Sequence, residues 1–598
     1  MRIAVIDRDR CKPRKCNLEC IRFCPKVRSG VEAIKIDEER KHVEIVEEAC
    51  VGCGICVRKC PFNAITVVNL AEELKEDCVH QYGPNSFRLY RLPVPKPGKT
   101  TGLIGPNGVG KTTAIKILAG VLKPNLGRYW DPPDWDEVIR FYRGSELQAY
   151  FQRLSQGRLR VVYKPEYIDA IPKLVKGTVK DILTNKDERG VLEEAVERLE
   201  LKNLLERRLS ELSGGELQRV AIAVACEREA DVYIFDEPTN YLDIYQRIKI
   251  ARVVRELSEK HGKTVLVIEH DLAVLDYLSD YVCVIYGEPG VYGVVSSPHG
   301  VKEGINIYLD GYIPDLNIKF RREPVRFSMP VEERVRVEKE VLVEIPPMKK
   351  SYNGSFTLEV EGGEVYRGEV IVAMGPNGIG KTTLAKLLAG VLKPDEGSSP
   401  KENIKVAYKP QYIRPSFEGT VEELLLTVNE GFFKTELCKT ELIRPLGLEK
   451  LLDKEVPSLS GGELQRVAIV TCLLREADLY IIDEGSAFLD VEQRLAMARA
   501  IRRFIRDMEK SALVIEHDII VANAVADRVM LFTGESGVYG KALKPMELKE
   551  GMNLFLSRMD VTFRRDLRTG RPRINKPGSR LDRIQKEKGE YYYVTPAA

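Results

Sequence analysis

The sequence has no apolar run approaching the roughly 20 residues that a transmembrane helix needs. Its first residues also lack the charged-then-apolar pattern of a signal peptide, and together these absences predict a cytoplasmic protein without a membrane partner. The net charge of +3 over 598 residues indicates no partner by itself. With 44% apolar and 30% charged residues, the composition is that of a globular protein, and the length predicts several domains.

Cysteine is scarce in most of the chain, since eight of the 13 cysteines lie before residue 61. In a reducing cytoplasm such clustering indicates metal ligands and not disulfides. One run, C-x2-C-x2-C-x3-C before a proline, is the pattern that ligates a 4Fe–4S cluster in bacterial ferredoxins. An upstream run, C-x4-C-x3-C-x3-C, also ends in Cys-Pro.

Two-cluster ferredoxins exchange the fourth cysteine of each run between the clusters. We therefore predict two 4Fe–4S clusters, one on Cys24, Cys50, Cys53 and Cys56 and the other on Cys11, Cys16, Cys20 and Cys60. Zinc is the alternative, but zinc sites usually use paired C-x2-C knuckles. The two Cys-Pro endings favour iron–sulfur.

Eleven residues occur twice, because LSGGELQRVAI covers residues 212–222 and again 459–469. An identical run of this length indicates an internal duplication. In each copy a serine can cap a helix expected to begin near Glu216 or Glu463, and two glycines leave backbone N–H groups open to an anion. The candidate anion-binding residues are Ser213, Gly215, Glu216, Ser460, Gly462 and Glu463.

Each half of the chain also contains the P-loop pattern G-x4-G-K-T, between a predicted strand and a predicted helix. In this context backbone N–H groups hold phosphates, the lysine reaches the β and γ oxygens, and the threonine after it ligates Mg²⁺. The candidate residues are Gly105, Asn107, Gly108, Gly110, Lys111, Thr112 and Thr113 in the first copy and Gly375, Asn377, Gly378, Gly380, Lys381, Thr382 and Thr383 in the second.

An apolar strand after each repeated run is expected to end in an aspartate that holds Mg²⁺ and a glutamate that polarises the attacking water as general base. A histidine ends the next strand, at the same spacing in both copies, and would contact the γ-phosphate or the water. These residues are Asp236, Glu237 and His270 in the first copy and Asp483, Glu484 and His517 in the second. Asp243 and Asp490 are expected near the opposite nucleotide site.

These motifs together resemble those of an ATP-binding cassette (ABC) ATPase, in both copies. The resemblance implies two cassettes paired head to tail, binding ATP/ADP and Mg²⁺ at two sites. Ser213 would then serve the Lys381 site, and Ser460 the Lys111 site. An aromatic side chain could stack on adenine, with core packing as the alternative; the candidates are Tyr82 or Phe87 in the first cassette and Tyr352 or Phe356 in the second.

The two cassettes depart from each other at two places. In the family a glutamine beyond the P-loop helps bind Mg²⁺, and the second cassette has it as Gln411, whereas the first has Glu166. We therefore expect unequal sites. The first cassette also has an insertion at residues 131–160, where Asp134 and Ser145 can each cap a short helix. This aromatic- and arginine-bearing segment is either a docking arm or a surface excursion.

Each cassette is followed by a similar tail, since KEGINIYL (302–309) matches KEGMNLFL (549–556). We interpret the two tails as a composite hinge. The whole arrangement resembles ABC subfamily E, the RNase L inhibitor-like ribosome-recycling ATPases, in its archaeal type. The resemblance implies that ATP-driven closure swings an iron–sulfur head against a terminating or stalled ribosome and splits it into subunits, with a release factor or Pelota-like factor bound.

The same resemblance implies structural clusters and a transient stay on the small subunit, with rRNA, ribosomal proteins and initiation factors as partners. Arginines of the second tail are candidate rRNA contacts, although they could instead pair with acidic hinge residues: Arg564, Arg565, Arg568, Arg571 and Arg573. About the last 25 residues could be a disordered basic end. Two alternatives remain, a redox ATPase that couples ATP turnover to electron transfer and a factor that blocks subunit joining.

The expected fold class is α/β, with two ABC-type P-loop domains in one monomeric chain behind a ferredoxin-like α+β domain. The expected boundaries are 1–75 for the iron–sulfur domain, 76–298 for the first cassette, 299–345 for the first hinge, 346–543 for the second cassette, and 544–598 for the second hinge and tail.

Overall fold

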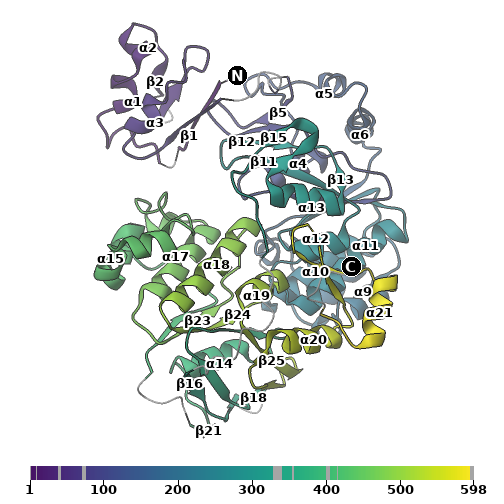
Figure 1. The fold of residues 1–598 in the computed structure, drawn as a ribbon. Coiled ribbons are helices and arrows are strands. Elements are labelled where there is room, and N and C mark those ends of the chain that lie inside the picture. Colours follow the sequence, from purple (N-terminus) through teal and green to yellow (C-terminus); the bar gives the residue numbers. More distant parts are fainter. Residues whose placement is uncertain are drawn as a thin grey trace.

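The computed structural model describes residues 2–8, 10–37, 42–69, 74, 76–327, 340–352, 356–398, 404–413, 415–566 and 568–592. Figure 1 shows a small N-terminal domain and two larger domains, with the C-terminal segment beside the junction of the larger two. Within these ranges no helix is both long and apolar enough to cross a membrane. Parts of the expected first hinge (328–339) and of the C-terminal tail (593–598) lie outside the described residues.

The N-terminal domain is a small α+β unit, and strand β1 (Arg2–Ile6) contributes side chains to two hydrophobic clusters. β1 pairs antiparallel with β4 (Ile65–Asn69), and β2 (Ile34–Asp37) pairs antiparallel with β3 (His42–Ile45). Because side chains alternate along a strand, Ala4 and Ile6 pack on the cysteine side while Ile3 and Val5 pack against Val291 of the first cassette. The short helices are α1 (Glu19–Arg22), α2 (Pro25–Arg28) and α3 (Ile55–Lys59).

The first cassette is built on a sheet whose central strands are parallel and buried. Its order is β8 (Val161–Lys164), β9 (Val232–Asp236), β10 (Thr264–Ile268), β7 (Thr100–Ile104), β11 (Tyr281–Glu288), β12 (Tyr292–Val295), β6 (Arg88–Tyr90) and β5 (Cys78–Gln81). Strands β7, β9 and β10 are neighbours in parallel register. Their carboxyl ends therefore meet at one edge, which brings the P-loop, the carboxylate pair and the histidine together.

The second cassette repeats this order, which agrees with the duplication. Its strands run β22 (Val406–Lys409), β23 (Leu479–Asp483), β24 (Ser511–Ile515), β20 (Val370–Met374), β25 (Arg528–Glu535), β26 (Tyr539–Ala542), β18 (Phe356–Val360), β17 (Met348–Tyr352) and β21 (Glu396–Gly397). A separate pair consists of β16 (Val341–Ile345) and β19 (Gly363–Tyr366). Further short strands are β13 (His299–Gly300), β14 (Tyr312–Ile313), β15 (Ile318–Lys319) and β27 (Met546–Glu547).

The helices of the two cassettes correspond in the same way. The first has α4 (Lys111–Leu118), α7 (Ile171–Leu174), α8 (Val179–Lys186), α9 (Leu192–Arg198), α10 (Gly214–Glu227), α11 (Ile244–Glu259) and α12 (Leu272–Leu278). The second has α14 (Lys381–Leu388), α15 (Val421–Phe433), α16 (Glu436–Cys438), α17 (Gly461–Leu474), α18 (Val491–Asp507) and α19 (Ile519–Val525). Helices α10 and α17 begin two residues earlier than expected, because each capping serine is followed at once by helical glycines.

The insertion forms the two expected helices, α5 (Trp135–Phe141) and α6 (Glu146–Ser155). Asp134 caps the first by accepting from the Glu137 N–H at 2.7 Å, whereas the Ser145 side chain makes no cap bond. The aromatics are less exposed than the sequence indicated, because Phe151 is fully buried and Tyr142 stacks on it at 5.0 Å. The insertion is therefore a packed part of the first cassette, with Phe141 exposed at its surface and Trp130 exposed just before it.

The two tails cross over to the opposite cassette. In the first tail, α13 (Val301–Asp310) places the Tyr308 hydroxyl 3.2 Å from Glu492 of the second cassette. In the second, α20 (Leu548–Arg558) places the Phe555 ring 5.6 Å from Tyr245 of the first. This reciprocal packing agrees with the interpretation of the tails as one composite hinge.

Much of the second tail forms regular structure, and its segment 561–575 is largely buried. Its elements are β28 (Phe563–Arg565), β29 (Pro572–Ile574) and α21 (Arg580–Lys588), so the basic end expected as disordered contains a helix. The Arg571 and Arg573 guanidiniums bond Asp276 of α12, and Arg565 bonds Asn523 of α19. These three arginines are buried, so the prediction that they contact rRNA is wrong for this conformation.

Arg568 remains exposed and pairs with Asp310 of the first tail. It therefore follows the alternative that hinge arginines pair with acidic hinge residues. Arg564 is half-buried, with burial and then the neighbouring Arg573 lowering its pKa.

Candidate nucleotide and iron–sulfur sites

Each P-loop joins a buried strand to a helix through glycines that no larger residue could replace. Gly110 has φ +92° and Gly380 has φ +99°, in the left-handed region that favours glycine. A Cβ on Gly110 would come 2.6 Å from the Phe87 ring, and one on Gly380 would come 3.0 Å from the Phe356 ring. These phenylalanines therefore pack on the P-loops. Tyr82 lies differently, with an exposed ring and its hydroxyl 3.0 Å from Thr113 Oγ1.

The P-loop lysines are buried among the carbonyls of their own loops. Lys111 Nζ donates to the Gly105 and Pro106 carbonyls, each at 2.9 Å. Lys381 Nζ donates to the Gly375 carbonyl at 2.8 Å. Burial lowers the pKa of Lys381 to about 8 although Asp243, Glu484 and Asp483 oppose this change. A phosphate chain would supply the negative charge that such a buried ammonium lacks.

The two expected general bases are held in strained backbone conformations. Glu237 has φ 46° and Glu484 has φ 49°, and non-glycine residues in this region cluster at functional sites. Buried lysines support both turns, because Lys164 Nζ donates to the Asp236 carbonyl at 3.0 Å and Lys409 Nζ to the Asp483 carbonyl at 2.8 Å. Sequence reasoning missed these lysines, although both follow an apolar strand pattern as VYK and AYK.

The strand-end histidines lie against the glutamates, a contact that the sequence did not predict. His270 Nε2 is 3.0 Å from Glu237 Oε1, and His517 Nε2 is 3.2 Å from Glu484 Oε1. Burial, reinforced by the charge of Lys111, lowers the pKa of His270, whereas the charge of Glu237 opposes this change. Burial would raise the pKa of Glu237, but His270 and Lys111 lower it to about 2. The carboxylate is therefore ionised and able to accept a proton.

The expected Mg²⁺ ligands lie together in each cassette. The Thr112 hydroxyl hydrogen-bonds Asp236, and the Thr382 hydroxyl hydrogen-bonds Asp483. Burial, followed by the charges of Glu237 and Glu166, raises the pKa of Asp236 to about 7. A buried carboxylate beside a hydroxyl fits a divalent cation.

Each P-loop touches the turn that follows the carboxylate strand of the other cassette. The Asn107 N–H donates to Asp490 Oδ2 at 3.1 Å, and the Asn377 N–H donates to Asp243 Oδ2 at 2.8 Å. Both aspartates also cap the helices that they precede, α18 and α11. The expectation that they lie near the opposite nucleotide site is therefore consistent with the geometry.

The repeated LSGGE runs adjoin these same turns. Ser213 and Glu216 form a reciprocal capping box, as do Ser460 and Glu463. A Cβ on Gly215 would lie 2.9 Å from the Tyr241 carbonyl. That carbonyl accepts from the Asn377 side chain of the second P-loop at 3.4 Å. Tyr241 thus connects the LSGGE run of the first cassette, which we call its signature run, to the P-loop of the second.

The amide donors around the two glutamates differ. Gln411 Nε2 donates to Glu484 Oε1 at 2.7 Å. Glu166, its counterpart in the first cassette, is a half-buried carboxyl whose pKa is raised by burial and then by Glu237. There Asn240 Nδ2 donates to Glu237 Oε2 at 2.5 Å instead. Sequence reasoning missed Asn240, although it stands three residues after Glu237 at a position where the second copy has alanine.

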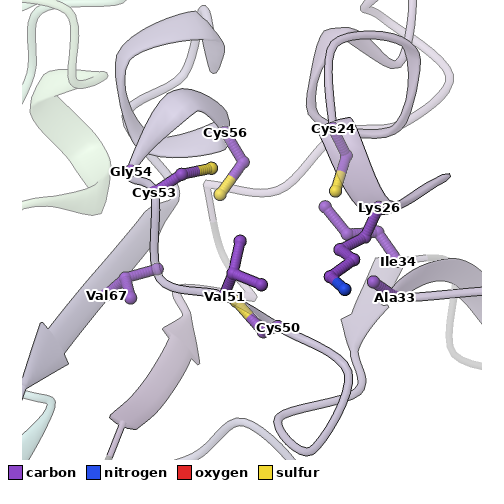
Figure 2. A pocket seen from close by; sticks show the side chains of 10 residues that line it. All are labelled: Cys24, Lys26, Ala33, Ile34, Cys50, Val51, Cys53, Gly54, Cys56 and Val67. Atoms are coloured by element: carbon purple, nitrogen blue, oxygen red, sulfur yellow. The ribbon is translucent and has the colours of Figure 1, made fainter. Parts of the chain in front are cut away.

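The eight N-terminal cysteines form two groups, divided as the ferredoxin pattern predicts. Figure 2 shows Cys24, Cys50, Cys53 and Cys56 around one cavity, with apolar neighbours such as Ile34. The other group surrounds Cys20, whose pKa is raised by burial and then by nearby Cys60, Cys11 and Cys16. Four sulfurs around an apolar-walled cavity fit a cluster ligated by thiolates.

Three sequence families match parts of this chain. Residues 95–240 and 361–487 match the ABC transporter family, residues 1–32 match the possible Fer4-like domain in RNase L inhibitor, and residues 43–66 match the 4Fe-4S binding domain. Together with the fold, these matches define an ABC-type ATPase with two cassettes and an N-terminal iron–sulfur domain.

Full-length relatives define the family more closely. An uncharacterized ABC transporter ATP-binding protein of Methanocaldococcus jannaschii is 53% identical over 99% of this chain and 98% of its own. The translation initiation factor RLI1 of Saccharomyces cerevisiae is 48% identical over 99% and 98%. The ABCE1 chain in a model of ribosome-bound archaeal Pelota and ABCE1 is 58% identical, with TM-score 0.93 over 99% of both chains. The chain belongs to the RNase L inhibitor family, ABC subfamily E.

Proposed function

We propose that this ATPase is a ribosome recycling factor, which splits post-termination or stalled ribosomes into subunits and stays transiently on the small subunit. The likeness over 99% of the chain to an ABCE1 in a ribosome-bound complex with Pelota carries this proposal. A further relative of known structure, an archaeal ribosome recycling factor solved with the ribosomal stalk protein aP1, is 57% identical over 87% of this chain, with TM-score 0.83. The proposed location is the cytoplasm, where ribosomes are.

The proposed chemistry places one ATP between each P-loop and the signature run of the opposite cassette. Lys111 and Lys381 bind the β and γ oxygens, while the first-turn N–H groups next to Ser213 and Ser460 complete each γ-phosphate site from the other side. Glu237 and Glu484 take the proton of the attacking water, and the histidines orient it. Tyr82 is the better adenine-stacking candidate in the first site, because Phe87 is packed on Gly110.

The same proposal assigns the metal ligands. Mg²⁺ would neutralise the phosphate charge when held by Thr112, Asp236 and Glu166 in the first site and by Thr382, Gln411 and Asp483 in the second. The two cysteine groups would each hold one 4Fe–4S cluster, which would tie the short helices of the head together. In a domain this small, such ligation supplies stability that its apolar core lacks.

Movement of the head is proposed to follow from its unequal attachments. Asn85 of the first cassette donates to the Ala4 and Ile45 carbonyls of the head at 3.1 and 2.9 Å. Among the residues that the structure describes, the head reaches the second cassette through a hydrogen bond from Arg10 to the Lys450 carbonyl at 3.3 Å. Closure of the cassettes would therefore carry the head with the first cassette and break the weaker contact.

A sucrose gradient tests the proposal. Intact ribosomes with a Pelota-like or release factor, the protein and ATP should separate into subunits, and a nonhydrolysable ATP analogue should leave the protein on the small subunit. The Glu237→Gln/Glu484→Gln variant should also remain bound there. Failure to sediment with either subunit, or cluster reduction that depends on ATP turnover, would favour the redox alternative.

A further inference from the structure

In the described part of the chain, the carboxylate of each catalytic glutamate accepts a hydrogen bond from a side-chain amide, but the two amides come from different places in the fold. Asn240 lies in the turn between β9 and α11 and donates to Glu237 Oε2. Gln411 lies just beyond β22 and donates to Glu484 Oε1. Because the acceptor in each case is a carboxylate, both are charge-assisted hydrogen bonds.

At each of these two positions only one of the two cassettes has an amide side chain, and it is a different cassette at each position. Where the second cassette has Gln411, the first has Glu166, and an ionised carboxylate there has no N–H to donate. Where the first cassette has Asn240, the second has Ala487, whose methyl group also cannot donate. Each site therefore retains one amide, and the loss at one position is matched by a gain at the other.

We propose that Asn240 and Gln411 are alternative positioning residues, each of which orients the general base of its own site. An amide donor fixes the rotamer of a carboxylate and leaves lone pairs for the attacking water, because an ionised carboxylate has about four acceptor positions. His270 occupies Oε1 of Glu237 and Asn240 occupies Oε2, whereas His517 and Gln411 both reach Oε1 of Glu484. The two bases are thus held in different ways.

The two amide donors also differ in whether their segments contact the opposite cassette. Asn240 precedes Tyr241, whose carbonyl accepts from Asn377 in the opposite P-loop. The first base is therefore positioned by a turn that touches the other cassette. Gln411 belongs to the strand end of its own cassette and precedes Tyr412, which is 80% exposed. Hydrolysis in the first site should depend on cassette contact more strongly than hydrolysis in the second.

The test measures ATP hydrolysis without ribosomes, one site at a time, and rests on the proposed roles of Glu237 and Glu484. In a Glu484→Gln background only the first site hydrolyses. There Asn240→Ala should lower kcat about tenfold with little change in the KM for ATP. Adding Glu166→Gln, which supplies the donor from the position used in the second cassette, should recover most of that loss.

The mirror experiment uses a Glu237→Gln background, in which only the second site hydrolyses. Gln411→Glu should lower kcat, and Ala487→Asn should restore it. Thermal unfolding of each variant monitors folding, and a residue that acts only in folding would not be rescued by a change on another loop.

An unchanged kcat in Asn240→Ala, or a double variant no faster than Asn240→Ala alone, would overturn the inference. Parental hydrolysis by the Glu237→Gln/Glu484→Gln variant would instead refute the general-base assignment. Because no ribosome enters this assay, neither result bears on the proposed recycling function.

Discussion

From the signature run onward the two cassettes have the same residue spacing, whereas before it their spacing differs. Equivalent residues after that point are all 247 positions apart, as the pairs Ser213 and Ser460, Glu237 and Glu484, Asp243 and Asp490, and His270 and His517 show. The P-loop lysines are 270 positions apart, because the first cassette carries its insertion between P-loop and signature. The equal spacing includes the turns that contact the opposite P-loops, whereas the inserted helices α5 and α6 lie away from the second cassette (Figure 1).

Equal spacing nevertheless places equivalent residues in unequal surroundings. Asp276 and Asn523 stand at the same position of α12 and α19. The hinge holds Asp276 with the charged pair Arg571 and Arg573, but it holds Asn523 with weaker contacts from Arg565 and Tyr592. The composite hinge is therefore attached to the first cassette by buried charges and to the second by hydrogen bonds to an uncharged amide.

The largest expected effect comes from removing the general bases. Glu237→Gln and Glu484→Gln should each abolish hydrolysis in one site, and the double variant should lose about 10²- to 10⁴-fold in kcat. Phosphate release under single-turnover conditions measures this loss, and filter binding of ATP checks that nucleotide still binds. Equal residual rates in the two single variants would remove the expected inequality of the sites.

A second prediction concerns a substitution that makes the hinge contact of the first cassette resemble that of the second. Asp276→Asn should destabilise the hinge by about 3–5 kcal/mol, because it removes the carboxylate that both buried arginines bond. Asn523→Ala removes a neutral group and should cost about 1–2 kcal/mol. Hydrogen exchange of segment 561–575 with a urea titration measures both effects. Equal costs would show that charge does not distinguish the two attachments.

A third difference lies at the ends of the signature helices. Glu227 in α10 is fully buried and corresponds to Leu474 in α17. Burial, followed by the charge of Asp187, raises the pKa of Glu227 to about 7 from its ordinary 4.5. The unfolded chain therefore ionises first as the pH rises, so stability falls between about pH 4.5 and 7 and stays low above that range.

Glu227→Leu should remove this slope and stabilise the first cassette by about 2–3 kcal/mol at pH 8. Thermal unfolding at pH 4.5 and pH 8 measures the difference, with Leu474→Met in the second cassette as a control for packing. A variant that keeps the parental pH slope would show that Glu227 does not cause it.

The smallest effect is expected at the inter-cassette aspartates. Asp243→Asn and Asp490→Asn keep an oxygen that can cap α11 or α18, so each should leave stability within about 0.5 kcal/mol of the parent. Asp243→Ala should cost about 1 kcal/mol through the lost cap and weaken closure on the second P-loop. Calorimetry and small-angle scattering with an ATP analogue measure these changes, and a stable, fully closing Asp243→Ala would contradict the contact.

Sequence reasoning was most successful where the chemistry is local. The P-loop glycines, the carboxylate pairs and the cysteine runs act through residues a few positions apart, so their spacing indicates their geometry. It was less successful where burial decides the outcome. Arg571 and Arg573 are basic residues in a basic segment, and nothing near them in the sequence indicates that Asp276 neutralises them.

The sequence by itself determined the duplication, the class of ATPase, the nucleotide-binding motifs and the grouping of the cysteines, because each depends on covalent spacing or on recurrence. Only the tertiary structure decided which atoms join each turn to the opposite P-loop, which amide hydrogen-bonds each glutamate and which arginines are buried. Those contacts join residues as far apart as Asn107 and Asp490. They depend on how the two tails pack the cassettes face to face, and no short pattern along the chain specifies that packing.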